Sequence, residues 1–175
     1  MRVPPQQPAP EVPHATTRTS SLTELQRQQL VHTVRERAAD ELRREECETD
    51  GTYDTADSLS DGEALVLIEC WRGAYQSSSL AFRLPRDGSG APQRVRLTLP
   101  FRIDGEDRVV DTFTAAAYEK GQLSHYAKGR GLADCGESAT WVFDGQDFRL
   151  RDYYLLRACQ GRPGEWPALW RSRDD

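Results

Sequence analysis

The sequence ALVLIECW at residues 64–71 decides the class of fold. It includes the longest uninterrupted apolar run of the chain, from Ala64 to Ile68, and the turn pair Asp61-Gly62 precedes it. A short apolar run bounded by turn residues is typical of a buried β-strand. We therefore predict a buried strand over residues 64–71, with Cys70 near its end.

The chain downstream of this strand alternates apolar and polar residues with a period of two. The alternation is clear at residues 80–84 and 95–101, and further strand character follows at 109–118, 122–127, 141–143 and 148–159. Period-two alternation indicates strands with one exposed face, and short turns favour antiparallel neighbours. The pair Asp144-Gly145 indicates a hairpin between the last two segments.

The chain upstream of the strand has helical periodicity. Ser21 and Glu24 have the spacing of a capping box, which predicts a helix from there to about Glu46. Six apolar residues form one stripe along it: Leu22, Leu25, Val31, Val34, Ala38 and Leu42. The expected fold is α+β, with this N-terminal amphipathic helix packed on an antiparallel β-sheet meander of about six strands, stapled by disulfides.

Composition divides the chain into two parts. Residues 1–20 contain five prolines, which fix the backbone and remove donors, so we predict an extended linker there. Residues 21–175 are expected to form a single α+β domain. No apolar stretch is long enough for a transmembrane segment. The start, MRVPP, lacks the apolar core of a secretory leader, so we expect either a cytosolic protein or an exported one whose leader is absent from this chain.

Four cysteines bear on the compartment: Cys47, Cys70, Cys135 and Cys159. No Cys-x-x-Cys pair is present, so structural zinc is not expected. Of the three possible pairings we favour Cys47–Cys70 and Cys135–Cys159, because each closes a local loop of about two dozen residues. Disulfides of this kind favour a periplasmic or secreted protein. The alternative is four reduced, buried cysteines in a cytosolic protein.

The sequence gives little sign of catalysis or of cofactor binding. The net charge of −5 lacks the basic footprint of a nucleic-acid-binding protein. His125 is the only histidine placed to act as a base, and no Gly-x-Ser-x-Gly elbow accompanies it. The acidic cluster Asp50, Asp54 and Asp57 does not fit a calcium loop. We expect no enzyme activity, no cofactor and no metal.

The segment KGRG at residues 128–131 is the best candidate for a contact site. Its glycines permit a sharp turn or the close approach of a partner, while Lys128 and Arg130 are suited to a phosphate or carboxylate. The alternative is a structural turn that leads to Cys135. The four tryptophans, at positions 71, 141, 166 and 170, are interpreted as core, or else as a face that binds sugar or protein.

Three segments together support a family resemblance. They are CWRGAYQ at 70–76, KGRGLADCG at 128–136, and WVFDG at 141–145 followed by WPALWR at 166–171. Residues 45–171 resemble the C-terminal half of the bacterial envelope family Domain of Unknown Function 1176. The resemblance implies export and disulfides but no established activity. It marks six positions of interest: Cys70, Tyr75, Lys128, Arg130, Asp134 and Cys135.

The resulting hypothesis is a non-catalytic binding module of the periplasm or cell envelope. Its partner is expected to be a protein, as for an inhibitor or immunity protein, and its binding residues are expected to be Tyr75, Lys128, Arg130 and Asp134. The alternatives are a carbohydrate- or peptidoglycan-binding module that uses exposed tryptophans, and a hydrolase that uses His125 or paired acids.

Overall fold

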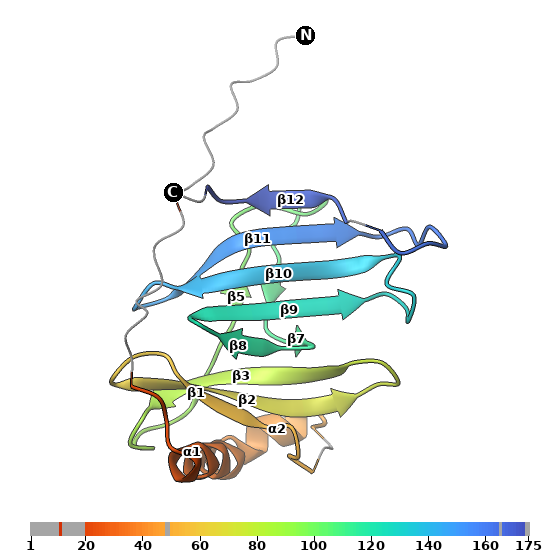
Figure 1. Ribbon diagram of the computed structural model, residues 1–175. Coiled ribbons are helices and arrows are strands. Elements are labelled where there is room, and N and C mark those ends of the chain that lie inside the picture. Colours follow the sequence, from red (N-terminus) through yellow and green to blue (C-terminus); the bar gives the residue numbers. More distant parts are fainter. Residues whose placement is uncertain (1–10, 12–19, 48–49, 165, 174–175) are drawn as a thin grey trace.

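A computed structural model describes residues 11, 20–47, 50–164 and 166–173 of the chain. Within these residues it contains two helices and twelve strands, which form two five-stranded sheets and one two-stranded sheet. The prediction of one helix on a single six-stranded meander is therefore wrong. Figure 1 shows the helices against one sheet and the second large sheet beyond it.

The predicted buried strand is β2 (Glu63–Arg72), at the centre of the first sheet. It pairs in antiparallel fashion with β1 (Thr55–Ser58) and β3 (Ser77–Pro85), and β3 also pairs with β4 (Gln93–Arg94) and β7 (Phe113–Thr114). All seven residues 64–70 are buried. A continuous apolar run, in place of alternation, is the pattern of a strand that is covered on both faces.

One face of the first sheet is covered by α1 (Glu24–Arg37) and α2 (Ala39–Arg44). The helix begins later than expected, because Thr23 and not Ser21 is its N-cap. The Thr23 hydroxyl accepts a hydrogen bond from the Gln26 amide at 3.2 Å, and the Gln26 side chain accepts one from the Thr23 amide at 2.9 Å. A break at Ala38 divides the expected single helix in two.

The apolar stripe on the helix is also shifted from the prediction. Leu25, which we assigned to the stripe, is 65% exposed, whereas Leu30 is 2% exposed. Leu30 and Val34 pack in one core cluster with residues of β2 and β3, among them Ile68 and Phe82. The buried face is therefore centred on residues 30 and 34.

The second large sheet is an antiparallel meander in which the strands follow chain order. Its strands are β8 (Ala117–Glu119), β9 (Gln122–Lys128), β10 (Gly136–Phe143), β11 (Phe148–Leu156) and β12 (Ala168–Arg171). The hairpin expected at Asp144-Gly145 joins β10 to β11. The C-terminal aromatic segment supplies the edge strand β12, which pairs with β11.

The segments at 95–101 and 109–118 do not form the long strands that their alternation predicted. They are broken into short pieces that include β5 (Leu97–Thr98) and β6 (Val109–Val110), which pair with each other. Their apolar side chains instead enter a second core cluster, where Val95, Leu99 and Phe113 join Trp141 of β10. This stretch connects the two large sheets and fills the space between them.

The two core clusters meet at β2, because alternate side chains of a strand point to opposite faces. Val66 and Ile68 belong to the cluster under the helices. Leu65 and Leu67 belong to the cluster shared with the second sheet. The strand β2 therefore packs against the helices on one side and against the second large sheet on the other.

Two disulfides join Cys47 to Cys70 and Cys135 to Cys159, which is the pairing favoured from the sequence. The first ties the segment after α2 to the end of β2. The second ties the loop before β10 to the segment after β11. Disulfides persist in oxidising environments, so these bonds indicate a location outside the cytoplasm. None of the helices among the described residues is long and apolar enough to cross a membrane.

The predicted linker at residues 1–20 lies outside the described residues, apart from Glu11 and Ser20. The division of the chain into this linker and a single domain over residues 21–175 stays a prediction.

The unequal burial of two leucines on α1 gives a test of the helix orientation. We expect Leu30→Ala to lower the free energy of unfolding by about 2–5 kcal/mol, because it opens a cavity in the helix–sheet core. We expect Leu25→Ala to change it by less than about 0.5 kcal/mol, because that side chain lies in solvent. Urea denaturation followed by circular dichroism measures both. Equal losses in the two variants would contradict the observed orientation.

Candidate functional site

Two segments that are far apart in the sequence meet at one end of the molecule. They are the β2–β3 hairpin, with CWRGAYQ, and the β9–β10 loop, with KGRGLADCG; both lie at the right-hand end of their strands in Figure 1. Gln76 joins them, because its side chain donates to the Tyr126 carbonyl and accepts from the Lys128 amide at 2.8 Å. Gly131 lies so close to Tyr75 that a Cβ there would be 3.1 Å from the ring.

Residues 129–135, here called the clamped loop, are held at their base by a buried carboxylate. Asp134 accepts hydrogen bonds from the Arg130 guanidinium, with Nε at 2.7 Å, and from the Gly161 amide at 2.6 Å. The Arg130 bonds hold the pKa of Asp134 well below its usual range, against the opposing effect of burial. Asp134 is therefore ionised, and it ties the loop to the segment after β11.

A disulfide and a tryptophan complete the base of the clamped loop. Cys135 is bonded to Cys159, and the Trp166 indole donates to the Ala133 carbonyl at 3.2 Å. Just beyond the loop, Gly136 has φ +144°, and a Cβ there would lie 2.2 Å from the Ala127 carbonyl oxygen. Only glycine fits this position, so the approach of the loop to β9 depends on it.

The tip of the clamped loop is exposed although its base is buried. Residues 129–132 are all exposed, whereas Asp134 and Cys135 are buried. Leu132 is 44% exposed, and the neighbouring Tyr75 is 74% exposed. The arrangement is a rigid base that presents a tip with an arginine and a leucine, next to an exposed tyrosine.

The structure places the four predicted binding residues around this loop, in different roles. Arg130 is exposed within the loop, and Tyr75 is exposed beside it. Lys128 lies at the end of β9 with its ammonium 5.9 Å from the centre of the Tyr126 ring. Asp134 is buried, so it holds the loop and does not present a surface.

Sequence reasoning missed two residues of this site. Leu132 was not selected, although an apolar residue in a glycine-rich polar turn is a signal of exposure. Trp166 was interpreted, with the other tryptophans, as core or else as part of a binding face, and its contact with this loop was not predicted. It is buried, and it stacks on Tyr126 with the ring centres 4.9 Å apart and an interplanar angle of 8°.

One aspartate and two cysteines lie close together at the base of the loop, but they do not form a metal centre. Ligand atoms of Asp134, Cys135 and Cys159 lie within 4.8 Å of one another. The two sulfur atoms are bonded to each other, so they cannot act as thiolate ligands. The only possible metal ligand left in this cluster is the Asp134 carboxylate, which already accepts hydrogen bonds from Arg130.

His125 lies in a buried polar network inside the second core. Its Nδ1 accepts from the Thr114 amide at 3.0 Å, which leaves the proton on Nε2, 3.2 Å from Glu137. Glu137 also accepts from the Tyr153 hydroxyl and from Arg108. Burial alone would raise the pKa of Glu137. The hydrogen bonds and the positive charge of Arg108 outweigh this effect and hold the pKa below its usual value. Both ring nitrogens of His125 are engaged, which favours a structural role.

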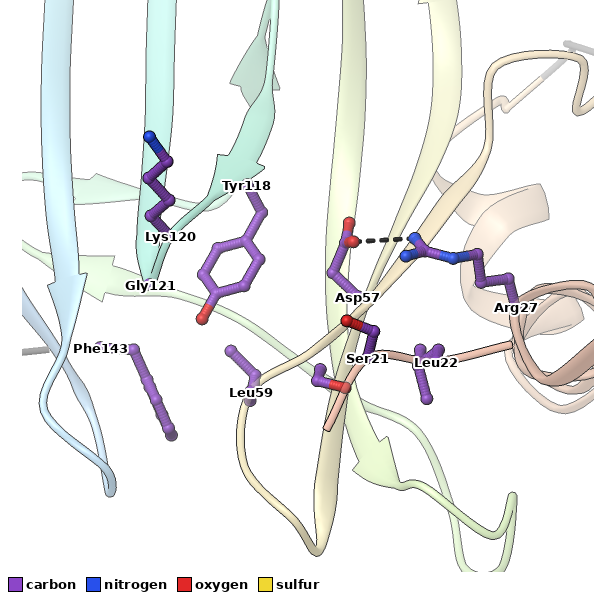
Figure 2. Close-up of a pocket in the computed structure, with 10 residues that line it drawn as sticks. Ser21, Leu22, Arg27, Asp57, Leu59, Tyr118, Lys120, Gly121 and Phe143 are labelled. Carbon is purple, nitrogen blue, oxygen red and sulfur yellow. Dashed lines mark hydrogen bonds and ion pairs between the residues drawn. The ribbon is translucent and has the colours of Figure 1, made fainter. Parts of the chain in front are cut away.

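A cavity of about 430 Å³ lies at the other end of β9, between the two large sheets (Figure 2). The start of the helical segment and the end of β1 form one side, and the β8–β9 turn forms the other. Ten residues line it: Ser21, Leu22, Arg27, Asp57, Ser58, Leu59, Tyr118, Lys120, Gly121 and Phe143. Sequence reasoning gave no indication of this cavity.

Comparison with known proteins places the chain in a family. A family model described as "Protein of unknown function (DUF1176)" matches residues 1–173, beyond the 45–171 of the resemblance. The chain is also 42% identical over 119 residues to "Uncharacterized protein YpfG" of Escherichia coli (strain K12); the match covers 66% of this chain and 34% of that protein. No solved structure matches the chain significantly. On the family match over essentially its whole length, the chain belongs to the DUF1176 family of proteins of unknown function.

Proposed function

We propose that the chain is a non-catalytic binding module of the periplasm or cell envelope, and that the clamped loop and Tyr75 bind a protein partner. An inhibitor or immunity protein acts in this way. The observation that carries the proposal is the combination of an exposed tip with a base fixed by a disulfide, a buried carboxylate and a tryptophan.

Preorganisation of the clamped loop favours the binding of a partner. Association loses the freedom of every loop and side chain that must become ordered, so a loop that is already rigid in the free protein binds with a smaller entropic cost. Tyrosine and arginine are also enriched among the residues that contribute most to protein–protein binding. Tyr75 and Arg130 occupy such positions at the tip of the molecule.

The burial of the tryptophans favours a protein partner over a glycan. A glycan module of the kind considered above needs exposed tryptophan rings. Trp141 and Trp166 are buried, and Trp71 and Trp170 are half-buried. The exposed aromatic residues at this end include Tyr75 and Tyr126, which suit protein contacts equally well.

A matched pair of leucine variants tests the proposal. The oxidised protein is immobilised and exposed to envelope and secreted extract, and retained proteins are identified and quantified by mass spectrometry. We expect Leu132→Ser to reduce the retention of a stoichiometric partner by about tenfold or more, because a central apolar contact is lost. We expect Leu169→Ser, on β12 and similarly exposed at 47%, to leave it unchanged.

Other outcomes of this experiment count against the proposal. Retention of a partner that is equally reduced by both leucine variants would point to non-specific adsorption. Retention of cell-wall fragments without a protein would favour the glycan alternative. Circular dichroism of each variant confirms that the fold is intact.

The buried carboxylate of Asp134 predicts a dependence of loop stability on pH. A group whose pKa is lowered by folding stabilises the folded state above its unfolded pKa, and this contribution is lost as the pH falls. We therefore expect Asp134→Asn to be less stable than the native chain at pH 7, with a difference that shrinks as the pH falls below the ordinary aspartate value of 3.8. Urea unfolding at a series of pH values measures this difference.

The control for this prediction is Asp61→Asn, because the Asp61 side chain is 81% exposed. We expect this variant to match the native chain at every pH. A stability deficit of Asp134→Asn that is the same at low and neutral pH would show that its charge does not hold the loop.

A further inference from the structure

The cavity of Figure 2 is separate from the clamped loop, because the two lie at opposite ends of β9. With seven residues in β9 and a rise of about 3.3 Å per residue, the strand separates them by roughly 20 Å. A ligand in the cavity would therefore leave the loop accessible.

Tyr118 supplies a free donor to this cavity. Its ring packs edge-on against Phe148, and Figure 2 shows the hydroxyl directed toward the space between Leu59 and Phe143. This hydroxyl has no hydrogen-bond partner among the described residues. Burial, and then the charge of Asp57, raise the pKa of Tyr118 to about 12, so the hydroxyl keeps its proton at neutral pH.

The charges around the cavity leave one cation without a partner. Arg27 and Asp57 neutralise each other, with Nη1 and Oδ1 2.8 Å apart, and Arg27 also donates to the Ala56 carbonyl. Lys120, at the rim, is exposed and makes no ion pair with any described residue. The lining thus carries a net charge of about +1, which favours a monoanion.

The lining of the cavity combines apolar side chains with polar ones. Leu22, Leu59 and Phe143 are buried and contribute to its lining. A concave apolar site with a few convergent polar groups is the usual form of a small-molecule site.

We propose that this cavity binds a small amphipathic carboxylate. The apolar body of the ligand lies against Leu59 and Phe143. Its carboxylate accepts a hydrogen bond from the Tyr118 hydroxyl. Figure 2 shows the exposed Lys120 side chain directed away from the cavity, so its ammonium pairs with the carboxylate only after this side chain turns toward the opening. No bond is made or broken, and the protein acts as a receptor for the anion.

Two probes of the same shape and different charge test the proposal. The ¹⁵N-labelled protein is titrated with hydrocinnamate and, separately, with hydrocinnamamide, and backbone amide shifts are followed by NMR. We expect saturable shifts at Ser58, Leu59 and Gly121 with the acid. We expect the amide to bind at least about tenfold more weakly, because it lacks the charge.

Matched variants identify the donors. Tyr118→Phe keeps the ring packing and removes only the hydroxyl, and we expect it to weaken hydrocinnamate binding by about fivefold or more. Lys120→Gln is expected to have an effect of similar size. The chain has only one other lysine, Lys128, so Lys128→Gln is the control and should bind the acid as the native chain does.

Several outcomes would overturn the inference. These are the absence of saturable shifts with the acid, equal affinity for the acid and the amide, or equal weakening by Lys120→Gln and Lys128→Gln. The proposal of a protein partner at the clamped loop is unaffected by any of them, because its test uses Leu132 at the other end of β9.

Discussion

The burial of β2 on both faces is the constraint on which the rest of the structure depends. A strand that buries seven consecutive residues needs an apolar layer on each side. The helices supply one layer, through Leu30 and Val34, and the second sheet supplies the other, through residues that include Trp141. The first disulfide reinforces this arrangement, because it fixes the segment after α2 to Cys70 at the end of the strand.

The stacking of the layers brings the ends of the two sheets together and so creates the clamped loop. The β2–β3 hairpin belongs to the first sheet and the β9–β10 loop to the second, and Gln76 bonds one to the other. The base of the loop combines contacts of different kinds, a covalent bond, an ion pair and an indole hydrogen bond, so no single weak interaction controls its shape. The proposal that this loop recognises a protein partner rests on this fixed base.

The opposite end of the sheets has a different character. There the layers leave a cavity whose lining includes three apolar side chains, together with a tyrosine hydroxyl and a lysine that have no partner among the described residues. The two ends are joined by β9, which carries buried Leu123 and His125 between them. The two proposed binding surfaces are therefore separated by the length of this strand, so a ligand at one leaves the other accessible. In a family without an assigned activity, these two surfaces are the features on which functional work can focus.

Local patterns in the sequence determined several parts of this structure. The apolar run at 64–71 indicated β2, Asp144-Gly145 indicated the β10–β11 hairpin, and the loop lengths favoured the disulfide pairing. Each of these depends on residues that are close together in the chain, so propensity and spacing are sufficient. The family motifs also directed attention to the KGRG segment, where the clamped loop lies.

Tertiary structure alone decided the remainder. Period-two alternation shows that a strand buries one face, but it does not show what covers that face, so the division into two sheets was not predictable. An apolar stripe on a helix likewise does not show which of its residues contact the sheet, so the exposure of Leu25 and the burial of Leu30 were not predictable. Asp134, marked by the family resemblance, was predicted to be a binding residue, yet it is buried, and Arg130 and Gly161 donate hydrogen bonds to its carboxylate. The cavity likewise combines residues from distant segments, and only the packing of the two sheets brings them together.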